Sequence, residues 1–246
     1  AAAFWALAFA SLHLVQGECD YHARIDAGSE QTCGIENTTD VVHCWGDMQA
    51  DSCSSGDVDY HSEFDVAQAA RPRFKQVSAG RFHACGITLA NDMRCWGTGK
   101  KAEPRAGKFK QVSASRYWNC AIRGQSVLWD PSQVDTLLCW GDEDGRNAEL
   151  GKPPTDKFRS VNMGREYGCG IRLDNTVACW GPCYDETCGS QVPTGSFRSI
   201  STGEDFACAI SLETDHAKCW GALNTSGIPA NAPDEPFVEI GVGKNF

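Results

Sequence analysis

The sequence predicts an all-β protein of the β-propeller class, with five full copies of one sheet-forming unit and part of a sixth. Three observations predict this fold. One pattern of residues recurs five times along the 246-residue chain. Each copy is rich in Val, Ile, Phe, Cys and Trp and is bounded by Gly, Asn, Asp or Pro, as strands and turns are. The glycine positions of successive copies lie 52, 35, 49, 39 and 40 residues apart, which is the length of a propeller blade.

The clearest copy starts at Phe74 and reads FKQVSAGRFHACGI, followed by RCWG at 94–97. In every copy a Val or Ile lies three residues before a Gly or Ser, a Cys lies five residues after it, and a Cys-Trp-Gly triplet follows. A sixth copy starts at Phe237, and the chain stops at Phe246 before the expected Cys. We therefore expect the repeat domain to be truncated at its C-terminus.

Each unit from the first Cys to the Cys-Trp-Gly triplet predicts a β-hairpin. In the copy at Phe74, two-residue alternation places His83, Cys85, Ile87 and Leu89 on one face, and the segment 90–92 turns the chain. One such sheet cannot bury both faces, but stacking blades around an axis does so. We expect little helix, and we expect the tryptophans of the triplets to pack between blades, namely Trp45, Trp96, Trp140, Trp180 and Trp220.

The consensus Phe-x-x-Val-Ser-Ala-Gly…His-x-Cys-Gly-Ile…Cys-Trp-Gly resembles the repeat of the regulator-of-chromosome-condensation family over residues 22–246. The segment 140–151 is similar to that family's Trp-Gly-x-Asn-x-x-Gly-Gln-Leu-Gly stretch. The cysteine-paired form is similar to extracellular members, among them crinkly-type plant receptor-kinase ectodomains and the propeller-type β-lactamase inhibitor protein. The resemblance implies a propeller, usually of seven blades, so five full repeats predict an incomplete ring. The founder's nucleotide-exchange activity is not carried over, because this chain has an export-like segment and no basic nuclear tail.

The chain holds 14 cysteines, and ten of them fall into five hairpin pairs: Cys33–Cys44, Cys85–Cys95, Cys120–Cys139, Cys169–Cys179 and Cys208–Cys219. Directly opposed residues of antiparallel strands lie within disulfide reach. We expect Cys183 to pair with Cys188, which is close in sequence, and Cys19 with Cys53 by elimination. Reduced core thiols are one alternative. Zinc bound by His83, Cys85 and Cys95, or by His43 with Cys33 and Cys44, is another, but the His does not recur. We expect no metal and no cofactor.

Composition and charge indicate the cellular compartment of the protein and the class of its partners. The net charge is −10 and Lys and Arg are scattered, which argues against a nucleic-acid partner. So many cysteines favour an oxidising compartment: secreted, cell-surface or organelle lumen. Residues 1–17 form an apolar segment of a signal-peptide-like or anchoring kind, ahead of a repeat domain at 18–246. Membrane association through residues 1–17 follows if the segment is retained.

Candidate binding residues come from the loops that do not recur. Trp129 and Asp130 lie at the tip of an extended hairpin, although Trp129 fits equally well if it packs back onto a blade. Tyr184, Asp185 and Glu186 lie in the loop between Cys183 and Cys188. The insertion 46–73 is acidic and fits either a solvated loop or a calcium or basic-protein contact. Asn37 and Asn224 start glycosylation sequons.

These patterns predict a non-enzymatic, disulfide-stabilised propeller that binds protein partners through its loops outside the cytosol. The alternative is an accessory structural subunit of a larger lumenal, membrane or extracellular assembly, retained by residues 1–17. A hydrolase on a propeller scaffold is a third hypothesis. No Ser-His-Asp signature, phosphate loop or metal motif supports catalysis.

Overall fold

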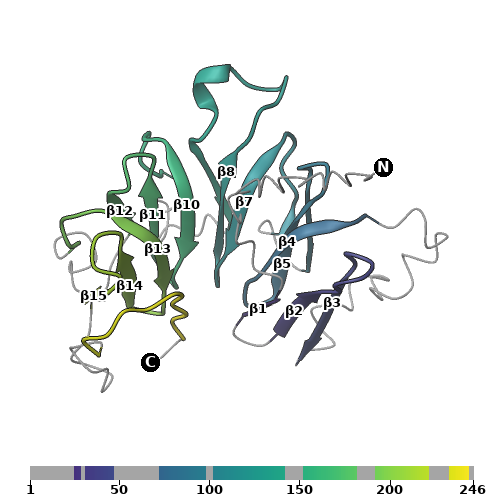
Figure 1. Cartoon of the computed structure of the whole chain (residues 1–246). Helices are drawn as coiled ribbons and strands as arrows, with labels where there is room; N and C mark the ends of the chain where they lie inside the picture. The colour runs from purple at the N-terminus through teal and green to yellow at the C-terminus, as the bar shows by residue number, and fades with distance from the viewer. Residues whose placement is uncertain are drawn as a thin grey trace, which may run out of the picture.

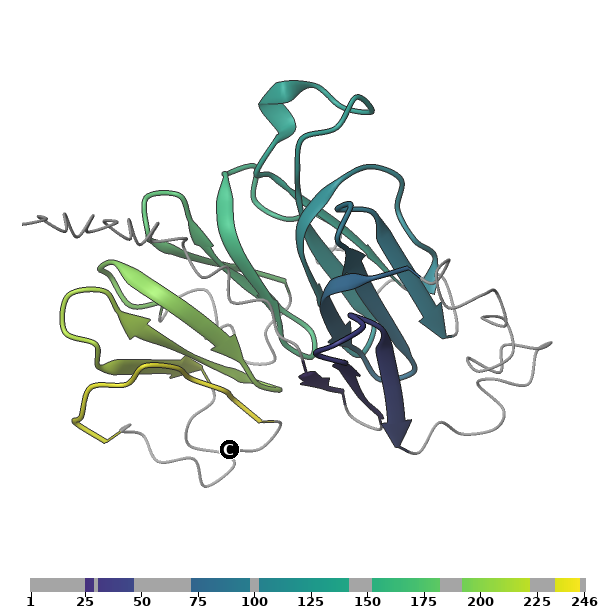
Figure 2. The ribbon, with the colours of Figure 1, turned by 45° about the vertical axis from the view of Figure 1, so that its right-hand side comes forward.

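A computed structural model describes residues 25–28, 31–46, 72–97, 102–141, 152–181, 192–221 and 233–243. Within these ranges the chain forms five three-stranded antiparallel sheets, each a simple meander. The sheets fan out side by side in chain order as an open arc of propeller blades (Figure 1), and the turned view in Figure 2 has the same arrangement. The predicted all-β propeller architecture is confirmed.

The blades are numbered in chain order. Blade 1 holds β1 (Ile25–Ala27), β2 (Gln31–Ile35) and β3 (Val42–Gly46), and blade 2 holds β4 (Phe74–Ala79), β5 (His83–Thr88) and β6 (Met93–Gly97). Blade 3 holds β7 (Phe109–Ala114), β8 (Trp118–Arg123) and β9 (Leu137–Gly141). Blade 4 holds β10 (Phe158–Met163), β11 (Gly168–Arg172) and β12 (Val177–Trp180), and blade 5 holds β13 (Phe197–Thr202), β14 (Phe206–Ser211) and β15 (Ala217–Gly221).

The hydrophobic core lies between blades. The cysteine side of each blade faces the next blade, and the tryptophan side faces the blade before it. Trp140, for example, packs with Cys85 and Ile87 of blade 2, and Trp220 packs with Cys169 of blade 4.

Four of the five predicted inter-blade tryptophans follow this rule, but the prediction for Trp45 is wrong. Trp140, Trp180 and Trp220 are buried, and Trp96 is half-buried against the cluster that holds Cys33 and Ile35 of blade 1. Trp45 is 50% exposed. It belongs to blade 1, and no sheet in the described part of the chain precedes that blade, so its ring has no cysteine side to cover it.

Edge strands normally leave backbone groups unpaired, and here side chains of the preceding blade pair them. Gln76 accepts a hydrogen bond from the Val112 N–H and donates one to the Val112 carbonyl, both at 2.9 Å. Two residues further on, the Ser78 hydroxyl accepts from the Ala114 N–H at 2.9 Å. Gln111 and Ser113 of blade 3 repeat both contacts on blade 4. The Gln before the repeat's Val and the Ser after it therefore fasten blade 2 to blade 3 and blade 3 to blade 4.

Blade 1 makes the corresponding contact with a carboxylate. Asp26 occupies the position of Ser78 in its blade, and it accepts from the Ala79 N–H at 2.8 Å and from the Ser78 hydroxyl at 2.9 Å. Burial raises the pKa of Asp26, although these hydrogen bonds oppose the shift.

The hairpin turns make a second joint between blades. One residue of each turn has a positive φ, and its carbonyl accepts the N–H of the Phe that starts the next copy of the repeat. These residues are Asp40, Asn91, Asp135, Asn175 and Asp215, all Asn or Asp, which tolerate the left-handed region. Residues 237–243, the start of the sixth copy, are held against blade 5 by two hydrogen bonds. The Phe237 N–H donates to the Asp215 carbonyl, and the Val242 N–H donates to the Ser201 hydroxyl.

One strand prediction needs correction. β5 ends at Thr88, and Leu89 does not share the buried face of His83, Cys85 and Ile87: it lies after the strand and is 49% exposed. Its backbone N–H bonds to the Arg73 carbonyl at 2.8 Å, which turns the side chain out of the sheet.

Helix is as scarce as predicted: the one helix that lies wholly within the described residues is a short 3-10 helix, Pro131–Gln133, between β8 and β9. No helix in the described ranges is long and apolar enough to cross a membrane. The apolar segment 1–17 and most of the acidic insertion 46–73 lie outside the described residues, so the predictions on them stay predictions.

Candidate functional site

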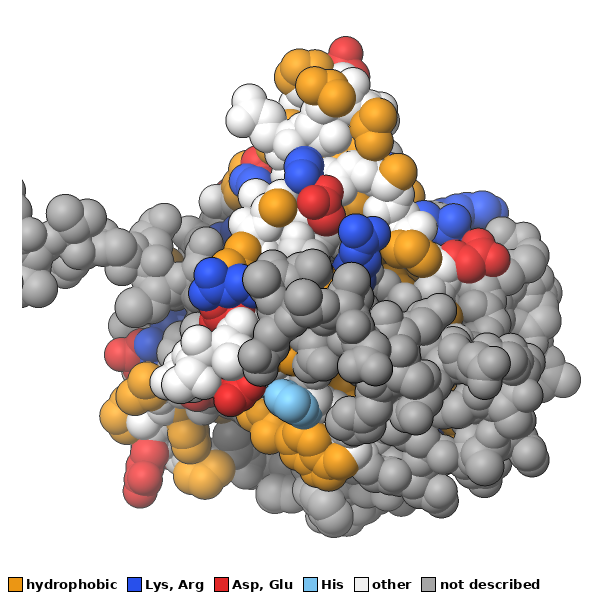
Figure 3. All heavy atoms as spheres, turned by 90° about the vertical axis from the view of Figure 1, so that its right-hand side faces the viewer, with side chains coloured by type: hydrophobic (Ala, Val, Ile, Leu, Met, Phe, Trp, Pro, Cys, Tyr) orange, Lys and Arg blue, Asp and Glu red, His pale blue; other side chains and the backbone are white. Residues whose placement is uncertain are grey.

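Among the connections that the structure describes, the one between β8 and β9 departs most from the repeat. The equivalent hairpins of blades 2, 4 and 5 turn within a few residues, whereas this connection runs over residues 124–136 and rises above the blades (Figure 1). In the first half of this connection, the side chain of Val127 is 101% exposed and that of Leu128 is 62% exposed. Figure 3 shows hydrophobic side chains gathered on this projection. A projecting apolar tip on a rigid scaffold is suited to contacting another protein.

Trp129 fixes the base of the projecting loop. Its indole N–H donates to the Gly124 carbonyl at 2.8 Å, and its ring meets Phe109 edge-on with 5.4 Å between centroids. A Cβ on Gly107 would lie 2.0 Å from the indole, so the absence of a side chain there makes room for it. Of the two arrangements that the sequence left open for Trp129, the structure has the one in which the ring packs back onto its blade.

Asp130 is a capping residue in this structure. Its carboxylate accepts the Ser132 N–H at 2.8 Å at the start of the 3-10 helix, and hydrogen bonds from Ser132 lower the pKa of Asp130. Together Trp129 and Asp130 rigidify the loop that presents Val127 and Leu128, so their proposed part in binding is indirect.

The same end of the other blades carries further exposed apolar side chains. Leu89, Leu173 and Leu212 hold one position in blades 2, 4 and 5, and each is about half exposed at 49–50%. Gly124 holds that position in blade 3, where the projecting loop begins. Because the blades repeat one meander, these residues lie at the same end of their sheets as the projecting loop, and we refer to this end as the turn face.

A groove lies beside the projecting loop on the turn face. Its volume is about 450 Å³, and its walls are the loop, β9 and the segment that leads into β10, contributed by Arg123, Ser132, Gln133, Thr136, Leu137, Leu138, Cys139, Pro153, Pro154 and Thr155. Arg123 is half-buried, and its guanidinium donates to the Thr136 hydroxyl at 2.9 Å and the Leu137 carbonyl at 2.7 Å. Burial lowers the pKa of Arg123 without removing its charge.

Sequence reasoning missed Val127, Leu128 and Arg123. From sequence alone, an apolar pair such as Val127 and Leu128 is expected in the core, because the sequence of a loop does not show whether its side chains face the protein or the solvent. Arg123 could have been found by aligning the repeats, since an Arg follows the Ile of the repeat at both 123 and 172.

The cysteines of the hairpins lie as the register predicts. Five disulfides join directly opposed residues of second and third strands, with Cα atoms 4.0–4.1 Å apart: Cys33–Cys44, Cys85–Cys95, Cys120–Cys139, Cys169–Cys179 and Cys208–Cys219. The same bonds occupy the sulfurs of the zinc alternative, and His83 instead bonds Asn119 of blade 3 at 2.7 Å. Cys19, Cys53, Cys183 and Cys188 lie outside the described residues.

The other predicted sites are only partly placed. Asn37 is exposed in the turn before β3, where the Thr39 hydroxyl of its sequon donates to Glu36. Tyr184, Asp185, Glu186 and Asn224 lie outside the described residues.

Comparison with known proteins identifies the repeat. A protein-family profile described as "Regulator of chromosome condensation (RCC1) repeat" matches residues 74–101, which contain blade 2. Blade 2 is therefore an RCC1-type repeat, and the five sheets have the architecture of RCC1-like propeller blades. The profile covers one copy, and the recurring strands, disulfides and inter-blade contacts extend the unit to the other four blades.

Solved structures resemble the arrangement of all five blades. The entire ectodomain of the receptor kinase CR4 from Physcomitrella patens has a TM-score of 0.65 at 21% identity, covering 89% of this chain and 55% of that one. The CRINKLY WD40 ectodomain of the Arabidopsis thaliana receptor kinase ACR4 has a TM-score of 0.59 at 25% identity, covering 86% and 66%. Yeast RCC1 (Prp20) bound to Kap60 has a TM-score of 0.62 at 14% identity, covering 89% and 65%. The chain thus spans 55–66% of the length of these RCC1 and crinkly propellers, which share its fold.

Proposed function

We propose that this RCC1-type chain is a non-enzymatic module that binds a protein partner through its turn face, outside the cytosol. The observation that carries the proposal is the projecting loop. Its base is held by Trp129 and capped by Asp130, while Val127 and Leu128 extend into solvent. A rigid apolar tip loses little conformational entropy on binding, which is the property of a good interface anchor.

The repeated disulfide supports the location. One bond in each of the five blades would be reduced in a cytosol and persists in an oxidising compartment. The crinkly propellers that resemble this fold are receptor ectodomains. Yeast RCC1, which shares this fold at 14% identity, is bound to Kap60, and this supports a protein as the partner class. Secretion and glycosylation at Asn37 are part of this proposal, and a role as an accessory subunit held by residues 1–17 stays a prediction.

A photo-crosslinking residue tests the proposal directly. It is placed at position 128 in the projecting loop, and at position 45 as a control, since Trp45 is also exposed but lies on β3. The oxidised full chain is irradiated with extracellular fluid from the cells that make it. The proposal expects a defined adduct at 128 that is absent at 45 and is lost when Val127→Asp is added.

An absence of any adduct at 128, or the same set of adducts at 128 and 45, contradicts binding through the projecting loop. Turnover in a hydrolase screen that is lost on mutation of a carboxylate contradicts the non-enzymatic part.

A further inference from the structure

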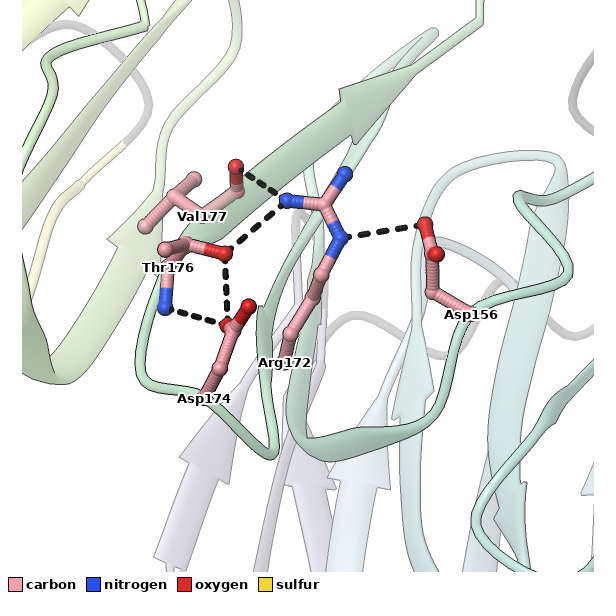
Figure 4. Close-up of polar contacts among 5 residues, drawn as sticks. All are labelled: Asp156, Arg172, Asp174, Thr176 and Val177. Carbon is pink, nitrogen blue, oxygen red and sulfur yellow. Dashed lines mark hydrogen bonds and ion pairs between the residues drawn. The ribbon is translucent and has the colours of Figure 1, made fainter.

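Two arginines at the same repeat position have different surroundings. Arg123 and Arg172 end β8 and β11, and each donates from one terminal nitrogen to a threonine hydroxyl and to a carbonyl of the third strand. In blade 4 the Arg172 Nε also donates to the Asp156 carboxylate at 3.0 Å, so the guanidinium is held between a carboxylate and the hairpin (Figure 4). Blade 4 therefore gives the arrangement that satisfies this arginine.

Blade 3 lacks the carboxylate. Asp156 lies two residues before the Phe that starts β10, and the residue two before Phe109 is Gly107. Trp129 packs over Gly107. The Arg123 guanidinium therefore faces the indole of Trp129, 5.8 Å from its ring centroid, where Arg172 has an acid. Arg123 has no carboxylate partner among the residues that the structure describes.

The acidic side chains of the elements around the groove have other partners. Asp130 caps the 3-10 helix, Asp135 is paired with Lys110 at 2.5 Å, and Asp156 is paired with Arg172. A half-buried guanidinium without an anion keeps its desolvation cost and gains no charge pairing. A carboxylate supplied from outside would make the charge-assisted bond that Asp156 makes in blade 4.

From this comparison we propose that the groove between the projecting loop and Pro153–Thr155 binds an acidic side chain of the protein partner, with Arg123 as the residue that receives the carboxylate. Leu138, Pro153 and Pro154 give the groove apolar walls for the residues beside that acid. The inference rests on the proposed function and names the chemistry of the partner at the foot of the projecting loop.

The test uses an array of random octapeptides, acetylated and amidated at their ends, probed with the oxidised full chain. The peptides that bind are expected to be enriched in Asp or Glu next to apolar residues, and their Glu→Gln or Asp→Asn forms are expected to bind about tenfold more weakly or worse. Arg123→Gln should lose the same binding. Arg172→Gln is the matched control, because it removes an arginine that already has its carboxylate.

A second variant avoids dependence on the folding of Arg123→Gln. Thr155→Trp fills the groove from its exposed wall and leaves the bonds of Arg123 in place, and it should also abolish binding. Retained binding in Thr155→Trp overturns the site.

Three other outcomes overturn the inference and leave the crosslinking test of the proposed function intact. The first is selected peptides with no acidic preference, or amide forms that bind within twofold. The second is binding only in a parallel array whose peptides keep a free C-terminal carboxylate, which assigns the groove to a chain end. The third is no binding by the unmodified chain, with an adduct still formed at position 128.

Discussion

Replacement of Gln76 by Ala tests the inter-blade joint at one residue. Gln76 is 4% exposed and pairs with both the N–H and the carbonyl of Val112, which is 1% exposed. β7 is the edge strand of blade 3, so neither group of Val112 has a sheet partner to return to. Each buried backbone group left unpaired costs about 1–3 kcal/mol, and freeing the glutamine side chain returns about 1.5 kcal/mol of entropy. The expected loss is about 3 kcal/mol.

The measurement is thermal unfolding of the oxidised chain, followed by both circular dichroism and tryptophan fluorescence to check that the transition is a single one. For a chain of this size a loss of 3 kcal/mol lowers Tm by about 6–12 °C. Ser199→Ala is the matched control, because Ser199 has the same position in blade 5 and its buried hydroxyl has no hydrogen-bond partner. Its Tm should stay within about 2 °C of the unmodified chain. Equal shifts of Tm in the two variants would contradict a stabilising contact between Gln76 and the backbone of Val112.

Three further predictions concern single features. Replacing Cys169 and Cys179 together by Ala opens a loop with a sequence separation of 10, and the free energy of unfolding in urea should fall by about 3 kcal/mol; an unchanged midpoint contradicts this. Asn175 has a φ of 69°, so Asn175→Val should cost about 1–2 kcal/mol while Asn175→Gly costs a few tenths, and equal costs in a denaturant titration would argue against a strained turn. Burial raises the pKa of Asp26 from its ordinary value of 3.8, so the folded state holds the proton more tightly than the unfolded state and stability falls as pH rises from 3.8 through the raised pKa. Asp26→Asn should remove that fall, and a pH–stability curve parallel to that of the unmodified chain would contradict the assignment.

Much of the fold could be predicted from the sequence because the repeat is strict. The Gly or Ser lies five residues before the Cys in every copy, which marks the same hairpin each time, and the pair Cys169–Cys179 follows from the recurrence of two cysteines in every such hairpin. The polar contacts between blades could not be predicted. Gln76 and Ser78 are visible in the motif, but their partners Val112 and Ala114 lie on the next blade and are backbone groups, which carry no sequence signal.

The error on Trp45, the open question of Trp129 and the missed groove have a physical origin too. Trp45 has the same local sequence as the buried tryptophans, and its exposure depends on the neighbour of blade 1 rather than on its own residues. The orientation of Trp129 depends on the missing side chain of Gly107, a residue of another segment. The difference between Arg123 and Arg172 likewise arises from what lies beside each arginine, so the candidate groove needed the structure.

A disulfide map of the oxidised chain, obtained by proteolysis without reduction and mass spectrometry, checks the blade architecture and its cross-links together. We expect a link within each blade, so that the peptide containing Cys85 carries Cys95 and the peptide containing Cys208 carries Cys219. Free thiols at these positions, or links between cysteines of different blades, would contradict an RCC1-type propeller whose blades are each closed by their own disulfide.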